Sequence, residues 1–355
     1  MALIAQAPVR ISFGGGGTDL AAYYRRYGGI VVSTAINRYV YTIVSDGVFD
    51  SQQIISADYH TFYRRPLSEN LIQERTLVWD GDLALPKTVL GYFGVKTGID
   101  IFLASEVPPG TGLGSSGSVA VSMVAALSAW LKRPMDKGEI AEIACHIEID
   151  RMSMPVGKQD QYAAAFGGLN VITFSADQTS VEPIHLDPDT LTRLQRSVLL
   201  FYTGQARDSA NILRHQWNAS EQDNPQVVQR LHTIKALALD IRDALVDGDI
   251  NAFGELMHHS WLNKRQLVAN ISNANVDEWY DVARQAGAIG GKITGAGGGG
   301  FLMLVCPPEA QPAVTEALGT RGLRRMDFAF DFTGARVVST DTKVRSSTAP
   351  AFARE

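Results

Sequence analysis

The chain has 355 residues, of which 45% are hydrophobic, enough for a large buried core and suggestive of two domains. Its formal net charge is -5 and it has no basic block, so we expect no nucleic-acid partner. The sequence shows no membrane span, no signal peptide and, with two cysteines, no disulfide framework, so we expect a cytoplasmic protein without a membrane partner.

Strand and helix signals are mixed in the first half of the chain. Runs of β-branched and aromatic residues predict strands at Val9–Phe13, Ile30–Ile36, Tyr39–Val44 and Ile99–Val107. A long helix is expected from about Ser116 to Leu131, and another within residues 134–152, opened by an Asp-containing cap. Residues 169–175 and 179–186 are expected to form a hairpin.

The second half is rich in helix signals. Helices are expected at Ser209–Ser220, Pro225–Val246, Asn251–Ala269, Asp277–Gly287 and 309–322. Between the last two, a glycine loop runs into an apolar strand within residues 290–306, and alternation predicts another strand at 326–332. The sequence therefore predicts an α+β protein with domains at 1–190 and 191–340, followed by a polar tail at 341–355 that we expect to be frayed or disordered.

The segment SEVPPGTGLGSSGS (105–118) follows the order strand, glycine-rich loop, helix, which is suited to holding phosphate. Glycines let the backbone approach an anion, and the N–H groups of the first helical turn point at it. No lysine follows these glycines, which excludes a Walker A motif. Gly112, Gly114 and Gly117 match GxGxxG, but a second helix follows instead of a parallel strand, which argues against a dinucleotide-binding oxidoreductase.

Two carboxylates lie twelve residues apart downstream of this loop. Glu148 is near the end of a predicted helix, and Asp160 lies between two glutamines. Phosphoryl transfer needs Mg²⁺ on the phosphates and a carboxylate near the attacking hydroxyl. Glu148 with Ser115 or Ser116 suits the first role and Asp160 the second. Asp150 is an alternative to Glu148, and spacing alone leaves open that both acids are ordinary solvated or capping residues.

Three motifs resemble those of the GHMP kinases, the family of galactokinase, homoserine kinase, mevalonate kinase and phosphomevalonate kinase. They are APVRISFGGGGTDL (7–20), PPGTGLGSSGSVA (108–120) and KITGAGGGGFLMLV (292–305). They occur in the family's order, and the resemblance spans roughly residues 3–335. The first motif and residues 199–213 look most like the sugar-1-kinase branch that contains D-glycero-D-manno-heptose 7-phosphate kinase.

The resemblance implies a two-domain fold: an N-terminal α/β domain with a left-handed βαβ crossover, a C-terminal ferredoxin-like domain, and an active site in the cleft between them. It implies ATP and Mg²⁺ as cofactors. Asp160 matches the catalytic aspartate with Arg10 beside it, and Ser116 (or Ser115) and Glu148 match the metal ligands. The implied ATP-binding residues are Pro109, Gly110, Thr111, Gly112, Leu113, Gly114, Ser115, Ser116 and Gly117. The expected substrate-binding residues are Gly15, Gly16, Gly17, Thr18, Asp19, Gln159, Arg207, Gly297 and Gly298.

Gly16 and Gly17 stand where galactokinases typically have Glu-His. A carboxylate would repel a phosphorylated substrate whereas glycine N–H groups attract it, so the change favours a sugar phosphate. Its phosphate could be bound by one of four cations, of which Arg25 and Arg26 are better explained as a solvated helix face; the others are Arg207 and Lys292.

The expected reaction is therefore transfer from ATP to the anomeric 1-hydroxyl of a sugar phosphate, D-glycero-D-manno-heptose 7-phosphate, for synthesis of a nucleotide-activated heptose. The alternatives are another sugar 1-kinase of fucose, glucuronate or galactose type, a mevalonate-type kinase, or a non-catalytic sugar- and ATP-binding regulator of the same fold. The sequence does not decide between a monomer and a homodimer.

Overall fold

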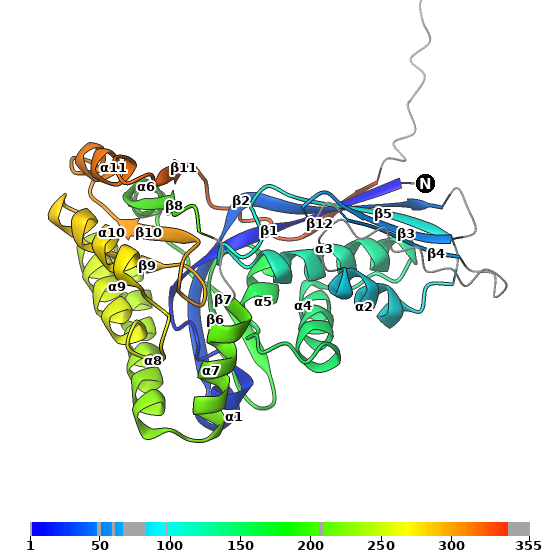
Figure 1. Cartoon of the computed structure of the whole chain (residues 1–355), viewed down its shortest axis with the longest axis horizontal. Helices are drawn as coiled ribbons and strands as arrows, with labels where there is room; N and C mark the ends of the chain where they lie inside the picture. The colour runs from blue at the N-terminus through cyan, green and yellow to red at the C-terminus, as the bar shows by residue number, and fades with distance from the viewer. Residues whose placement is uncertain are drawn as a thin grey trace, which may run out of the picture.

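The computed structural model describes residues 2–47, 51–58, 61–66, 83–96, 98–205 and 209–339. Two β-sheets organise this part of the chain (Figure 1). The larger has eight strands in the order β12-β1-β2-β5-β3-β4, with β6 pairing β2 and β7 pairing β6. Its strands are β1 (Ala2–Gly14), β2 (Gly29–Asp46), β3 (Ser51–Ser56), β4 (Thr61–Pro66), β5 (Ile99–Ser105), β6 (Leu169–Phe174), β7 (Thr179–Pro183) and β12 (Arg336–Ser339).

The strand β2 is a single element of 18 residues that joins the two strands expected at 30–36 and 39–44. It pairs with β1 along nearly its whole length, and its other edge is shared by β6 near the start and by β5 near the end. A register shift between Pro8 and Val9 of β1 marks the place where the long ribbon changes partners. Such irregularities bend a strand locally, which lets one strand belong to two parts of a sheet.

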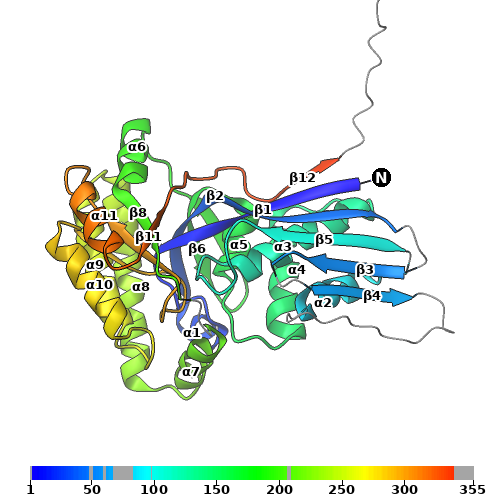
Figure 2. The same ribbon diagram turned by 45° about the horizontal axis from the view of Figure 1, so that its top comes forward.

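One face of the large sheet is covered by helices, as Figures 1 and 2 show. These helices are α2 (Ala84–Phe93), α3 (Ser115–Trp130), α4 (Lys137–Cys145), a π-helix (His146–Arg151) and α5 (Gln159–Phe166), while α1 (Ala21–Tyr27) lies at the far end of the first glycine loop. The helix α3 is buried on nearly every side, and its small and apolar residues allow close packing on β1 and β2. The beginning of α4 carries the expected cap, because Asp136 and Glu139 form a capping box.

The second sheet has the order β11-β8-β10-β9 and is antiparallel throughout. Its strands are β8 (Val198–Tyr202), β9 (Gly290–Ile293), β10 (Phe301–Val305) and β11 (Arg324–Met326). The helices around it are α6 (Pro188–Ser197), α7 (Ser209–Glu221), α8 (Pro225–Val246), α9 (Ile250–Lys264), α10 (Ala274–Gln285) and α11 (Gln311–Gly319). With α7–α10 as the first crossover and α11 as the second, the chain order is β-α-β-β-α-β, that of ferredoxin-like domains.

The large sheet with its helices (the N-terminal unit) and the second sheet with its helices (the C-terminal unit) share a core. Burial alternates over the first residues of β1 but becomes continuous from Ala7 onward. There, Val9 and Ile11 of β1 pack in one apolar cluster with residues of α8, α9, β8 and β10. A strand covered on both faces needs apolar residues at successive positions, which explains the sequence of this half of β1. The α+β class expected from the sequence is confirmed.

The strand expected at 326–332 is wrong. Within this segment only Met326 belongs to a strand, as the last residue of β11, and Phe330 forms a single bridge with Ile36. The apolar residues alternate because the segment crosses between the units and buries Phe330 in their shared cluster. The side chain of Asp331 holds this segment in place. Its carboxylate accepts hydrogen bonds from the Tyr39 hydroxyl and from the backbone N–H groups of Thr333 and Gly334.

After this crossing, β12 returns the chain to the first sheet, where it pairs antiparallel with β1. Because β12 comes from the C-terminal end of the chain and joins the first sheet, a single division near residue 190 stays a prediction. The tail predicted at 341–355 lies outside the described residues. Among the helices that are described, none has the length and hydropathy needed to cross a membrane.

Candidate active site

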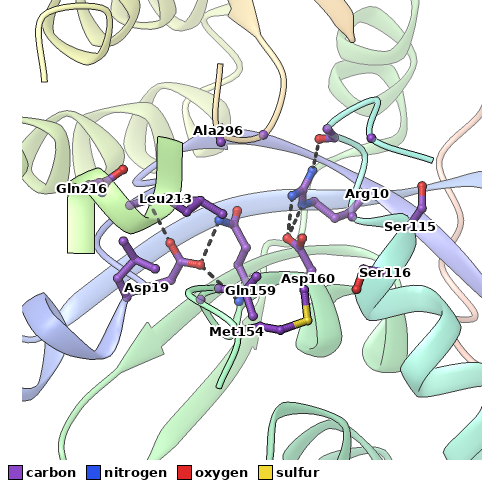
Figure 3. A pocket seen from close by; sticks show the side chains of 18 of the residues that line it. Arg10, Asp19, Ser115, Ser116, Met154, Gln159, Asp160, Leu213, Gln216 and Ala296 are labelled. Atoms are coloured by element: carbon purple, nitrogen blue, oxygen red, sulfur yellow. Dashed lines mark hydrogen bonds and ion pairs between the residues drawn. The ribbon is translucent and has the colours of Figure 1, made fainter. Parts of the chain in front are cut away.

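A pocket lies where the two units meet, between the glycine loops and the helices α5, α7 and α9 (Figure 3). It is lined by many residues expected from the sequence: Arg10, Gly17, Asp19, Gly110, Gly112, Gly114, Ser115, Ser116, Gln159 and Asp160. The other lining residues are Leu20, Met154, Val156, Gly157, Leu213, Gln216, Lys264, Gly295 and Ala296. The fold thus brings three separate glycine-rich segments to one place.

Arg10 and Asp160 form an ion pair inside this pocket. Arg10 donates from Nε and Nη2 to Asp160 Oδ1 at 2.8 and 2.5 Å, and from Nη1 to the Gly112 carbonyl at 2.6 Å. The Arg10 side chain is 3% exposed and that of Asp160 is 28% exposed, so the carboxylate is the more accessible partner of the pair. Because a guanidinium stays charged at any physiological pH, the pair fixes both a carboxylate and a cation beside the loop at residues 109–117, which is predicted to bind phosphate and is called the phosphate loop below.

Glycines of the phosphate loop let α5 approach closely. A Cβ on Gly117 would lie 2.8 Å from the Cβ of Asp160, and one on Gly114 would lie 3.1 Å from its Cγ. Gly114 also has a φ of +80°, a conformation that side chains rarely adopt. These two glycines therefore set how near Asp160 comes to the first turn of α3.

Glu148 lies behind the loop, on the π-helix that follows α4, and is 1% exposed. Ser116 Oγ donates to its Oε1, and Gln161 Nε2 donates to its Oε2 at 2.6 Å. Burial raises the pKa of Glu148 to about 7, against the lowering effect of these two hydrogen bonds. Asp150 is instead 58% exposed and bonded to His146, so the geometry favours Glu148 over the alternative acid.

The residues near Glu148 suit Mg²⁺ held jointly with phosphates. In the part of the chain that the structure describes, no cluster of three or more His, Cys, Asp or Glu side chains could hold a metal alone. Mg²⁺ typically takes one or two protein ligands together with phosphate oxygens, and Ser116 with Glu148 matches that number. Ser115 Oγ is buried without a partner at the first turn of α3, as expected where an anion would be received.

Asp19 lies at the end of the first glycine loop and is 2% exposed. Its carboxylate accepts from the Gly17 N–H at 2.8 Å and from Gln159 Nε2 at 2.9 Å. Burial raises the pKa of Asp19, and the neighbouring charge of Asp160 raises it further. A Cβ on Gly157 would lie 2.0 Å from Asp19 Oδ2, so this glycine is required by the position of the carboxylate. The result is a fixed hydrogen-bond acceptor at the pocket wall.

Some expected residues shape the loops without lining the pocket. Thr18 Oγ1 donates to the carbonyls of Gly15 and Ile30, at 2.8 and 2.9 Å. A Cβ on Gly15 would lie 1.8 Å from the Ile30 carbonyl oxygen. Gly16 is beside the pocket. Pro109, Thr111, Leu113 and Gly117 belong to the phosphate loop and helix start but are likewise not lining residues.

The third glycine loop reaches the pocket through Gly295 and Ala296 rather than through Gly297 and Gly298. Gly297 packs against Ile271, and the Gly298 N–H donates to the Ile271 carbonyl at 2.7 Å. Their conformation thus holds the loop in place.

Three of the four cations proposed for a substrate phosphate do not line the pocket. Arg26 is 44% exposed and pairs with Asp223, and Arg25 is also on the exposed side of α1. Lys292 is buried, and its Nζ donates to the Phe13 carbonyl at 3.2 Å. Arg207 lies outside the described residues.

Sequence reasoning missed Lys264 and Gln216, which line the pocket from α9 and α7. Lys264 is 7% exposed and its Nζ donates to the Gly295 carbonyl at 2.7 Å. Neither residue is part of a motif, and which face of a helix meets a pocket depends on how the two units pack.

Comparisons with known proteins identify the family of this chain. The sequence profile described as GHMP kinases N terminal domain matches residues 84–168, and that described as GHMP kinases C terminal matches residues 241–323. The D-glycero-alpha-D-manno-heptose 7-phosphate kinase of Campylobacter jejuni is 28% identical over 342 residues, 93% of this chain and 97% of that protein. A mevalonate kinase of Saccharolobus solfataricus is 30% identical over 224 residues, 63% of this chain and 67% of that protein.

Among solved structures, a D-glycero-D-manno-heptose 1-phosphate kinase from Bacteroides thetaiotaomicron superposes with a TM-score of 0.76 and 29% identity. The match covers 95% of this chain and 99% of the other. The chain therefore belongs to the GHMP kinases, ATP-dependent phosphotransferases whose acceptor is an alcohol group.

Proposed function

We propose that this kinase transfers the γ-phosphoryl group of ATP to the anomeric 1-hydroxyl of D-glycero-D-manno-heptose 7-phosphate. The observation that carries the proposal is the similarity, over nearly the full length of both chains, to the heptose 7-phosphate kinase of Campylobacter jejuni. The product would be a sugar 1-phosphate, the form that a later nucleotidyl transfer requires.

The loop at residues 109–117 would hold the ATP phosphates. Gly110, Gly112 and Gly114 all have positive φ, which turns the backbone tightly and allows it to approach an anion. Ser116 and Glu148 would hold Mg²⁺, which when bound would screen the negative charge of the phosphates.

Asp160 would act on the acceptor hydroxyl. Held through Oδ1 by Arg10, its carboxylate would orient the hydroxyl and take up its proton as the new O–P bond forms. Arg10 would also contribute positive charge beside the transferring phosphoryl group, where negative charge spreads over the oxygens. The ion pair holds both groups in place, which reduces the reorganisation needed during the reaction.

Asp19 and Gln159 would position the sugar. The Asp19 carboxylate is fixed by hydrogen bonds from the Gly17 N–H and from the side chain and backbone of Gln159, and Gln159 Oε1 is a buried acceptor without a partner in the described structure. Each offers an acceptor to a sugar hydroxyl. Burying acceptors that only a polyol would satisfy favours sugars over less hydroxylated alcohols.

The test is a coupled ADP-release screen of the purified protein with Mg·ATP. The acceptors are heptose 7-phosphate, hexose 6-phosphates, fucose, glucuronate, galactose and mevalonate. We expect the highest kcat/KM with heptose 7-phosphate. A higher kcat/KM with a free hexose or mevalonate would replace the proposed substrate, and ATP and sugar binding without any ADP release would indicate a regulator.

A further inference from the structure

The pocket has a polar wall opposite the phosphate loop, formed by the C-terminal unit. Gln216 projects from α7 on the side of the pocket away from Ser115 and Ser116 (Figure 3). Its side chain is 2% exposed, yet its Nε2 has no hydrogen-bond partner in the described structure. Since buried amide groups are normally hydrogen-bonded, a donor left in this position indicates that a ligand supplies the acceptor.

Two buried lysine side chains lie near this wall. Lys264 and Lys292 come from α9 and β9, and each is at most 7% exposed. Burial lowers the pKa of Lys292 well below its usual value, the charges of Lys264 and Arg10 lower it further, and the charge of Asp19 opposes this shift. Arg10 is already paired with Asp160, whereas an anionic ligand beside Lys264 would offset the repulsion between the two lysines.

Gly16 lies beside Lys264. A Cβ at this position would lie 3.5 Å from Lys264 Nζ, 3.8 Å from Ser12 Oγ and 3.9 Å from Gln159 Nε2, all ordinary contacts, and Gly16 has no positive φ. Its neighbours differ: Gly15 and Gly17 have φ of +83° and +104°, and a Cβ on Gly17 would lie 2.3 Å from Gln216 Nε2. The backbone thus requires glycine at 15 and 17 but not at 16, where a side chain would instead contact the ammonium group of Lys264.

We propose that Lys264 Nζ and Gln216 Nε2, which lie beside Gly16 and Gly17, bind the phosphate group that the sugar already carries. This inference rests on the proposed function, because it assigns the 7-phosphate of the heptose to a place in the same pocket. An ammonium group and the NH2 group of an amide can only donate hydrogen bonds, which suits a ligand group whose exposed oxygens all accept. The sugar would then lie with its phosphate between α7 and α9 and its 1-hydroxyl toward Asp160.

The experiment measures steady-state kinetics of Lys264→Met, Lys264→Arg, Gly16→Glu and Gly16→Ala with heptose 7-phosphate and ATP. We expect Lys264→Met to raise the KM for the sugar about tenfold or more, with the KM for ATP within about twofold, since charged hydrogen bonds contribute at this level. Lys264→Arg should restore much of the loss. Gly16→Glu should raise the same KM by placing a carboxylate before Lys264, while Gly16→Ala changes it little.

The matched control is Lys235→Met. Lys235 Nζ also donates to a backbone carbonyl, that of Tyr27 at 2.6 Å, but Lys235 does not line the pocket. We expect its kinetics to resemble wild type. A sugar KM unchanged in both Lys264→Met and Gly16→Glu would overturn the subsite while leaving the proposed function intact. Absence of turnover of heptose 7-phosphate by the wild-type enzyme would instead overturn the proposed function, and the subsite with it.

Discussion

The two acids nearest the phosphate loop differ in what surrounds them. Asp160 is bonded to the guanidinium of Arg10, a permanent cation. Glu148 is bonded only to the neutral side chains of Ser116 and Gln161, and burial raises its pKa to about 7. A charged carboxylate so enclosed is best stabilised by a cation, which suits a metal ligand, whereas Asp160 already has its cation and suits contact with the acceptor.

We predict that Asp160→Asn lowers kcat by about two orders of magnitude or more, the usual contribution of a positioned general base. ATP binding should persist, because the amide keeps the size of the carboxylate beside the loop. Steady-state kinetics together with titration of a fluorescent ATP analogue measures both effects. Asp150→Asn is the control, since Asp150 is exposed and bonded to His146. A kcat near that of wild type in the Asp160 variant would remove Asp160 from this role.

We predict that Glu148→Gln raises the Mg²⁺ concentration needed for half-maximal activity, because an amide oxygen is a weaker ligand for a hard cation than a carboxylate. The measurement is activity against total Mg²⁺ at saturating ATP, with free and nucleotide-bound ion calculated at each point. An unchanged titration curve would mean that the ion depends on other groups.

At the scale of the elements, glycines fix the spacing between loops and helices. The loop before α5 passes so close to Asp19 that a Cβ on Gly157 would overlap its Oδ2, at 2.0 Å. The N–H of Gln159, the first residue of α5, donates to Asp19 Oδ2 at 3.4 Å. Because Gly157 has no side chain, the start of α5 can approach Asp19 closely. This approach positions Gln159 and Asp160, which α5 carries, against the first glycine loop.

We predict that Gly157→Ala weakens sugar binding and lowers the melting temperature, because Asp19 and the start of α5 must separate to admit the methyl group. Gly91→Ala is the matched control: Gly91 lies within α2, and a Cβ there meets nothing within 4 Å. We expect that control to be stabilised by roughly 0.5–1 kcal/mol, the usual gain on replacing glycine in a helix. Thermal unfolding and the sugar KM test both, and equal behaviour of the two variants would contradict this explanation.

The sequence predicted best those parts whose signals are local. The long helix at 225–246 was predictable from its periodicity, and the structure confirms it. The glycine-rich loop between β5 and α3 was predictable from its glycine spacing, and its role in binding phosphate stays a prediction. The crossing segment at 326–332 was not, because its alternation arises from contacts with both units. Lys264 and Gln216 were missed for a related reason: the facing of α7 and α9 follows from the packing of the whole molecule.

At the scale of the whole molecule, the C-terminal unit supports the phosphate loop of the N-terminal unit. Thr294 Oγ1 donates to the Thr111 carbonyl at 3.1 Å. A Cβ on Gly300 would lie 2.2 Å from the same carbonyl oxygen, and Gly300 has a φ of +91°. The third glycine run thus allows two loops, distant in sequence, to touch through their backbones.

We predict that Gly300→Ala raises the KM for ATP, because the phosphate loop must shift away from Thr111 to admit the new methyl group and the backbone at 300 is strained. Gly319→Ala, in α11 with nothing within 4 Å of its Cβ, should leave the KM for ATP unchanged. A KM for ATP equal to that of wild type in the Gly300 variant would show that this contact does not govern nucleotide binding.

The central claim is that phosphate is transferred to the anomeric oxygen of a heptose that already carries one. The most direct measurement is phosphorus–proton correlation NMR of the product formed from ATP and D-glycero-D-manno-heptose 7-phosphate. We predict one new phosphorus signal coupled to the anomeric proton, alongside the original 7-phosphate signal. A new phosphorus coupled to any other sugar proton, or no new sugar phosphate while another alcohol consumes ATP, would contradict it.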